Sequence, residues 1–198
     1  FCCSYQVYPY LAGCFGLISC RHYLAVYGNL SDTSKFMFGQ LLCVNEDRFA
    51  MLLISLNGNY DGIVVDDIDD IFRIDSHGHY HEKMAKLSGL CIESLKIPCI
   101  DPSCIDLSIL SFAKETRSLV SIELRDSGIV DVVGFIENVA DEVCQIHVVD
   151  EYGYDDGCTF VDMSSISQIA LGSEDEQRIM KLYRANNQYT NKCSDWDA

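Results

Sequence analysis

Basic residues are scarce in this chain of 198 residues. It has 14 Lys and Arg against 30 Asp and Glu, which gives a formal net charge of −16. The imbalance is uneven, because residues 1–90 hold 6 basic against 10 acidic side chains, whereas residues 91–198 hold 8 against 20. An acidic field of this size repels phosphate backbones, so the composition disfavours general nucleic-acid binding. It favours solubility or a basic partner.

The signatures of common enzyme classes are also missing. The chain contains no Gly-x-Ser-x-Gly, no P-loop, no dinucleotide-binding glycine fingerprint and no His-Glu-x-x-His. Its 11 cysteines and 5 histidines permit many Cys–His pairs, so no single pair is informative. We therefore expect no catalytic activity, and the sequence predicts no cofactor.

An internal repeat is the clearest positive feature. Residues 36–87 match residues 131–182 at an offset of 95 with 10 identities and no gap. The identical pairs are Gly39/Gly134, Val44/Val139, Gly58/Gly153, Asp61/Asp156, Gly62/Gly157, Asp67/Asp162, Ile71/Ile166, Ile74/Ile169, Lys86/Lys181 and Leu87/Leu182. These residues are glycines, turn residues and apolar anchors, so the repeat predicts a shared scaffold. It does not predict a shared set of reactive groups.

The repeat predicts two domains. We expect a first domain at 1–90, a linker at 91–105, a second domain at 106–185 and a polar tail at 186–198. The apolar segment 1–20 is too short and interrupted to span a bilayer, and we expect it to belong to the first core.

The cysteines lack the spacing of a disulfide framework. No Cys-x-x-Cys occurs, and Cys144 and Cys158 stand where the other copy has Phe49 and Ile63. Exchange with apolar residues is typical of small buried hydrophobes, so we expect reduced thiols and a cytoplasmic protein.

Each copy predicts a helix, four short strands, the last of which runs into a segment with two shared isoleucines, and a closing helix. For the first copy the segments are 10–21, 23–27, 36–44, 49–56, 63–65, 67–74 and 80–87. For the second they are 107–113, 119–124, 132–139, 143–150, 158–161, 162–170 and 174–183. Asp106 is a candidate cap of the helix 107–113, and Ser173 with Glu176 forms a candidate capping box for the last helix. The loops 57–62 and 152–157 carry the shared Gly and Asp-Gly that hairpins require.

This order of elements, with a glycine inside the second strand, resembles the Sm-like and SH3-type small barrels. The resemblance implies two tandem β-barrels with flanking helices, a mainly β (α+β) fold. In Sm-family proteins this glycine precedes an RNA-contacting asparagine, whereas the matching positions here hold Phe49 and Cys144. The family's later Arg-Gly pair also has no match, so the resemblance implies the fold and not the RNA contact. Duplicated acidic chains of this kind also resemble uncharacterised bacterial proteins.

Three motifs are candidate metal or cation sites. His77, His79 and His81 alternate along one segment, which suits a transition metal, but the other copy has Gly172, Glu174 and Glu176 there. The segment 57–62 matches the start of a calcium loop, but its twelfth position is Ile68 instead of glutamate. The acidic run 66–70 keeps one acid in the second copy. A solvated turn or surface explains all three better than a metal site.

The hairpin loops are the candidate interaction surface. Tyr60 and Asp61 lie on the first loop, and Tyr152, Tyr154, Asp155 and Asp156 lie on the second. An exposed tyrosine presents a large rigid surface, although a tyrosine that packs on its own hairpin would contribute nothing. We therefore expect a non-catalytic acidic protein-interaction module. The alternatives are an Sm-like nucleic-acid-binding protein, or an immunity or antitoxin protein that neutralises a basic partner.

Overall fold

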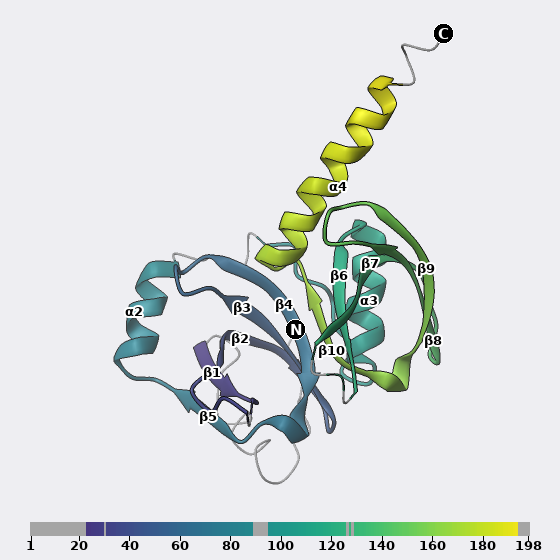
Figure 1. The fold of residues 1–198 in the computed structure, drawn as a ribbon. Coiled ribbons are helices and arrows are strands. Elements are labelled where there is room, and N and C mark those ends of the chain that lie inside the picture. Colours follow the sequence, from purple (N-terminus) through teal and green to yellow (C-terminus); the bar gives the residue numbers. More distant parts are fainter. Residues whose placement is uncertain (1–22, 30, 89–94, 126, 128, 194–198) are drawn as a thin grey trace. The chain divides into compact units, whose positions relative to one another are not determined.

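The computed structural model describes residues 23–29, 31–88, 95–125, 127 and 129–193, with side chains up to residue 188. The described part is mainly β, with ten strands in antiparallel pairs and three helices (Figure 1). The chain divides into two units, Phe1–Ser108 and Ile109–Ala198. A mainly β fold with flanking helices is thus confirmed. No helix in the described ranges is both long enough and apolar enough to cross a bilayer.

The first unit is a meander of five antiparallel strands. Its strands are β1 (Tyr23–Tyr27), β2 (Met37–Val44), β3 (Arg48–Ile54), β4 (Tyr60–Asp67) and β5 (Arg73–Ser76). They lie in the order β5-β1-β2-β3-β4, so β5 returns to pair with β1. A 3-10 turn, η1 (Ile68–Asp70), separates β4 from β5.

Both faces of this sheet are apolar, because successive side chains of a strand point to opposite sides. Leu24 and Val26 of β1 belong to one core cluster, with Phe49 and Met51 of β3. Ala25 and Tyr27 belong to the other cluster, which includes Met84 from helix α2 (His79–Ser88). The alternation therefore fills two cores, one of which α2 covers.

The second unit has the same succession of strands. They are β6 (Leu119–Leu124), β7 (Val130–Val139), β8 (Val143–Val149), β9 (Asp155–Asp162) and β10 (Ile166–Leu171), in the order β10-β6-β7-β8-β9. Another 3-10 turn, η3 (Met163–Ser165), precedes β10. Helix α3 (Ile105–Thr116) contains the boundary between the units, and helix α4 (Glu174–Cys193) follows β10.

Helix α4 covers one face of the second sheet. Ile179 of α4 is in a core cluster with Leu119, Phe135 and Val149, and Met180 and Tyr183 pack against this cluster. At the helix start, the Glu176 carboxylate accepts a hydrogen bond from the Ser173 backbone N–H at 2.7 Å, as the predicted capping box requires.

Glycines at equivalent positions of the two units meet the same steric constraint. A Cβ on Gly39 would collide with the carbonyl oxygen of Leu52, and a Cβ on Gly134 would collide with that of His147, 95 positions later. Gly58 (φ 82°) and Gly153 (φ 80°) share a left-handed conformation. The positive φ of Gly58 and Gly153 agrees with the prediction for the hairpin loops, whereas the close backbone approach at Gly39 and Gly134 is known only from the structure.

Several predicted boundaries are wrong. Helix α3 starts at Ile105, so Asp106 lies in its first turn and does not cap a helix at 107. Helix α4 continues to Cys193, beyond the predicted end at residue 183 and into the expected tail. The fourth strands do not run on through 67–74 and 162–170, because a 3-10 turn and a separate fifth strand follow in each unit. The helix expected at 10–21 lies outside the described residues.

The two cysteines that exchange with apolar residues differ in the structure. Cys144 is fully buried, as predicted, and burial raises the pKa of its thiol to about 11. Cys158 is exposed, although Ile63 at the matching position is buried. The prediction of a buried Cys158 is wrong, because β9 turns that side chain to the solvent side of the sheet.

Candidate interaction surface on the second unit

The loop between β8 and β9 is held by its own first residue. The Asp150 carboxylate accepts hydrogen bonds from the backbone N–H groups of Tyr152 (3.0 Å) and Tyr154 (2.7 Å). The Asp150 N–H donates to the Tyr154 carbonyl, and the Gly153 N–H donates to the Asp150 carbonyl. An Asp that bonds the N–H two residues ahead is the usual basis of a tight turn. The predicted hairpin is confirmed.

Helix α4 holds the tip of this loop through hydrogen bonds to its backbone. The Asn186 amide donates to the carbonyl oxygens of Tyr152 at 3.0 Å and Gly153 at 2.9 Å. Gly153 packs so closely on α4 that a Cβ there would lie 2.5 Å from the Tyr183 backbone nitrogen. The loop backbone is therefore tied to a helix, which restricts its motion without covering its side chains.

The side chains of the two loop tyrosines stay in solvent. Tyr152 is 65% exposed and Tyr154 is 58% exposed. A hydrogen bond to Glu151 raises the pKa of the Tyr152 hydroxyl, so this group is a neutral donor at physiological pH. Two exposed aromatic rings on an ordered loop suit contact with another molecule, since little entropy is lost on binding.

Strand β9 extends this surface along the edge of the sheet. It stands last in the strand order, and within the described part of the chain it pairs with β8 alone. Phe160 is 68% exposed, and Val143 of β8 is 43% exposed. Asp155, Asp156 and Asp162 of β9 are exposed as well. An edge strand with a large apolar side chain can accept a further strand, and acidic residues would select a basic one.

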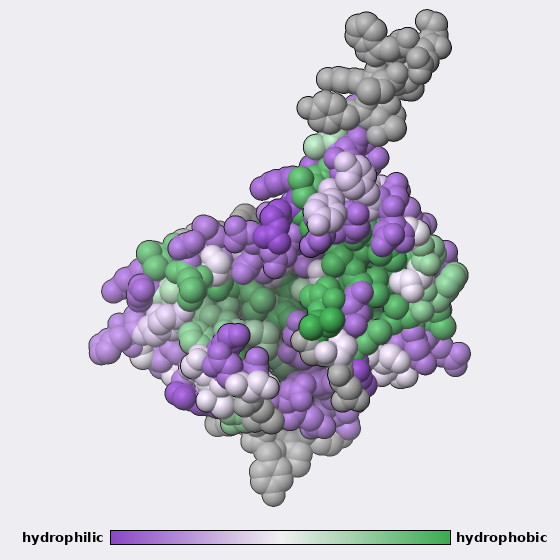
Figure 2. All heavy atoms as spheres, in the orientation of Figure 1, coloured by the Kyte–Doolittle hydropathy of each residue, from purple (hydrophilic) through white to green (hydrophobic). Residues whose placement is uncertain are grey.

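We define the edge surface as Tyr152, Tyr154, Asp155, Asp156 and Phe160. Sequence analysis found the first four and missed Phe160, because alternation predicts that a Phe in a strand faces the core. Figure 2 shows hydrophobic residues gathered over strands of the second unit, and hydrophilic residues along α4.

Asp155 of the edge surface pairs with His147 of β8. His147 Nε2 and Asp155 Oδ1 are 2.6 Å apart, and His147 is opposite Cys158 in the ladder between β8 and β9. The Cys158 sulfur accepts a hydrogen bond from the Gln145 amide at 3.5 Å, and its S–H points to the Thr159 carbonyl. A nucleophilic thiol needs a base that accepts its proton. The Cys158 thiol contacts Gln145 and Thr159, and His147 contacts Asp155. We therefore assign the His147 contact a structural role, which is to hold the Asp155 side chain in place.

The loop of the first unit presents less surface. Tyr60 and Asp61 are half-buried, and Tyr60 packs against the cluster of Phe38, Leu52 and Met84. Tyr60 thus packs on its own unit, and the two hairpin loops differ in the surface that they offer.

The three clustered histidines do not converge. His77 has a left-handed backbone (φ 67°), His79 is fully exposed, and the His81 ring bonds the Asp75 carbonyl at 3.1 Å while it packs near Phe38. Because α2 begins at His79, the residues no longer alternate on one extended segment. Within the described ranges, no three His, Cys, Asp or Glu side chains form a group that could hold a metal ion.

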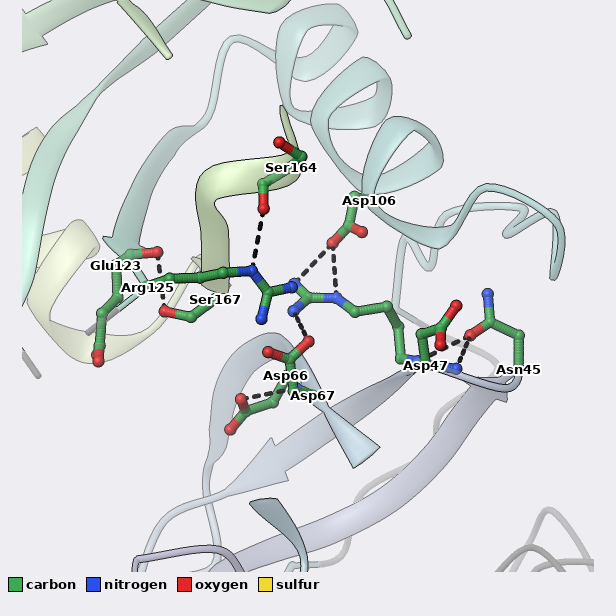
Figure 3. A network of polar contacts seen from close by, with 10 residues as sticks. Asn45, Asp47, Asp66, Asp67, Asp106, Glu123, Arg125, Ser164 and Ser167 are labelled. Carbon is green, nitrogen blue, oxygen red and sulfur yellow. Dashed lines mark hydrogen bonds and ion pairs between the residues drawn. The ribbon is translucent and has the colours of Figure 1, made fainter. Parts of the chain in front are cut away.

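The acidic run 66–70 contributes to a buried ion network that sequence analysis missed. Arg48 is 6% exposed, and its guanidinium bonds Asp67 at 2.5 Å and Asp106 at 2.8 Å. Figure 3 shows the carboxylates of Asp67 and Asp106 turned toward this one guanidinium. Burial lowers the pKa of Arg48, but Asp106 and Asp67 raise it further, so its pKa lies above the ordinary value. Asp67 is thus a structural partner of Arg48.

In the second unit a different arginine, Arg125, bonds the turn before the last strand. Arg125 Nε donates to the Ser164 carbonyl at 2.9 Å and so holds the 3-10 turn before β10 (Figure 3). Val143 occupies the position that matches Arg48. The second unit therefore has no counterpart of Arg48 at this position.

The edge surface is the strongest candidate site, and it consists of contact residues without a reactive group. Comparison with protein-family models, with curated proteins and with solved structures finds no match to this chain.

Proposed function

We propose that the protein is a non-catalytic protein-interaction module, and that its edge surface binds a basic, extended segment of another protein. The observation that carries the proposal is the ordered loop with two exposed tyrosines beside an open, acidic edge strand. A cytoplasmic location suits this function, because Cys99, Cys104, Cys144 and Cys158 form no disulfide.

We further propose that the two units are copies of one small Sm-like or SH3-like barrel. Strands β3 and β8 start at Arg48 and Val143, β4 and β9 start at Tyr60 and Asp155, and both offsets are 95 residues. In each unit the fifth strand returns beside the first, which small barrels of this kind require. The steric roles of the paired glycines support the same origin.

Charge selects the class of partner. The edge surface carries Asp155 and Asp156, Glu151 and Asp150 precede it, and Asp162 ends β9. A partner strand with alternating basic and apolar residues would pair with the β9 backbone, meet the carboxylates with its basic residues and cover Phe160 with its apolar ones. An immunity or antitoxin protein that neutralises a basic toxin would be one specific form of this function.

A peptide array tests the proposal directly. The full chain, labelled with a fluorophore, is applied to ten-residue peptides that alternate Lys with Val or Thr, and to matched peptides with Glu in place of Lys. We expect binding to the Lys series alone, with an affinity that falls as salt rises.

Two charge-reversal variants locate the contact. Asp155→Lys with Asp156→Lys should abolish binding to the Lys series. The control Asp141→Lys with Glu142→Lys makes the same charge change at the exposed turn between β7 and β8, and should keep most of the binding. Equal losses in both variants would show unspecific attraction and refute the edge assignment. Light scattering tests whether the chain associates with itself. If it does, and Phe160→Ser abolishes the association, the edge surface binds a second copy of this chain instead of another protein.

A further inference from the structure

A cavity beside α4 in the acidic second unit is lined by basic residues. It has a volume of about 280 Å³ and lies between the end of α3, the start of β6 and one face of α4. Arg117, Lys181 and Arg184 line it, with Thr116, Ser118 and Gln177. Gln177, Lys181 and Arg184 are spaced by three or four residues, so they share a face of α4.

The three cations of this cavity lack ion-pair partners among the described residues. Three arginines elsewhere in the chain are paired: Arg48 with Asp67 and Asp106, Arg73 with Asp75, and Arg178 with Asp175. In a chain with 30 acidic residues, three basic groups around one cavity without such pairing form a local positive site. The positive potential there is available to a ligand.

The one carboxylate in the cavity lining is turned to the protein. Glu176 is 3% exposed, and its two oxygens accept hydrogen bonds from the Ser121 hydroxyl and the Ser173 backbone N–H. Because both carboxylate oxygens accept these hydrogen bonds, Glu176 forms no ion pair with Arg117, Lys181 or Arg184.

The backbone of Arg117 gives independent support. The Ser118 N–H bonds the Ala113 carbonyl, and the Arg117 N–H bonds the Lys114 carbonyl, so α3 ends in a Schellman motif. Arg117 takes the left-handed position of this motif (φ 47°), which normally holds glycine because a side chain there costs about 1 kcal/mol. A strained residue that places its charge at a cavity points to a function for the side chain.

We infer that this cavity binds a small phosphomonoester. Arginine and lysine donors match the three oxygens of a phosphoryl group, and Leu119 and Met180 in the lining offer apolar contact to its organic part. The volume suits a small molecule. A nucleic acid would bring many more phosphates into the field of a chain with net charge −16, so the acidic surface selects against it.

Calorimetric titration of the full chain with three probes tests the ligand class. The probes are inorganic phosphate, phenyl phosphate and phenol. We expect phenyl phosphate to bind most tightly, inorganic phosphate to bind more weakly and phenol to give no heat. Equal binding of phenol and phenyl phosphate would overturn the assignment, and so would tighter binding of a ten-nucleotide single-stranded RNA.

One variant separates binding from folding. Arg117→Gly removes the guanidinium and relieves the strained backbone, so we expect equal or higher thermal stability with at least tenfold weaker binding of phenyl phosphate. The control Arg178→Gln removes a charge from the same helix outside the cavity lining, and should change affinity less than about twofold. Unchanged binding in Arg117→Gly, or an equal loss in Arg178→Gln, would refute the site.

Discussion

At the residue scale, the glycines that pair in the sequence have a steric and local role in both units. Gly39 and Gly134 stand where the neighbouring strand carbonyl leaves no room for a Cβ. We expect Gly39→Ala and Gly134→Ala each to lower the free energy of unfolding by about 3 kcal/mol, because a backbone atom must move. Urea denaturation measures the change.

The matched control is Gly28→Ala. The nearest atom to a Cβ at Gly28 lies 3.7 Å away, which is ordinary van der Waals contact. This variant should leave stability unchanged or raise it by about 0.5 kcal/mol, because alanine restricts the unfolded chain. An equal loss in all three variants would contradict the steric explanation.

The role of Arg48 could not be predicted from the sequence, since Asp67 and Asp106 are 19 and 58 residues away from it. Arg48→Ala would leave two carboxylates without their buried partner. We expect a loss of about 3–5 kcal/mol in the free energy of unfolding. Arg73→Ala, which removes a more exposed pair with Asp75, should cost less than about 1 kcal/mol. A smaller loss for Arg48→Ala than for Arg73→Ala would contradict this assignment.

The two contrasting cysteines provide a chemical test. At pH 8 we expect iodoacetamide to modify the exposed Cys158 and to spare Cys144, whose thiol is buried with a pKa of about 11. Peptide mass mapping of the folded chain gives the modified fraction. Since the unfolded thiol ionises near its ordinary value of 9.0, the stability from Cys144 burial is complete below pH 9 and falls as pH rises toward 11. Modification of both thiols at equal rates would show that Cys144 is accessible.

At the scale of elements, the period of the sequence predicted strands well and their ends poorly. Strands β1 and β6 have their predicted bounds because alternation and flanking turn residues mark them. The 3-10 turns were missed, since the Asp162 side chain that accepts the Ser164 N–H also fits a strand end. The extra length of α4 was missed because its polar sequence after residue 185 lacks an apolar face.

The C-terminal part of α4 holds the β8–β9 loop, which its polar composition does not predict. Asn186 holds the carbonyls of the β8–β9 loop, so Asn186→Ala should loosen the loop. We expect faster amide hydrogen exchange at Tyr152 and Tyr154, with a loss of about 1 kcal/mol in overall stability. Asn187→Ala, at the next and exposed position, should leave the exchange unchanged. The same exchange in both variants would remove Asn186 from this role.

At the scale of the whole molecule, the net charge of −16 opposes folding through self-repulsion. Salt screens exposed charges and affects the buried Arg48 network much less. We expect the melting temperature to rise by about 2–4 °C between 20 and 300 mM NaCl, which corresponds to about 1 kcal/mol in a chain of this length. Calorimetry measures the shift, and a fall with salt would show that attractive ion pairs dominate.

The sequence by itself determined the strand succession, the glycine positions, the hairpin turns and the acidic character, because each depends on neighbours in the chain or on composition. Only the tertiary structure decided that Phe160 faces solvent, that Asp67 and Asp106 share Arg48, and that Arg117 joins Lys181 and Arg184 around one cavity. These arrangements depend on residues far apart in sequence and on the side to which an edge strand turns. Local periodicity carries neither kind of information.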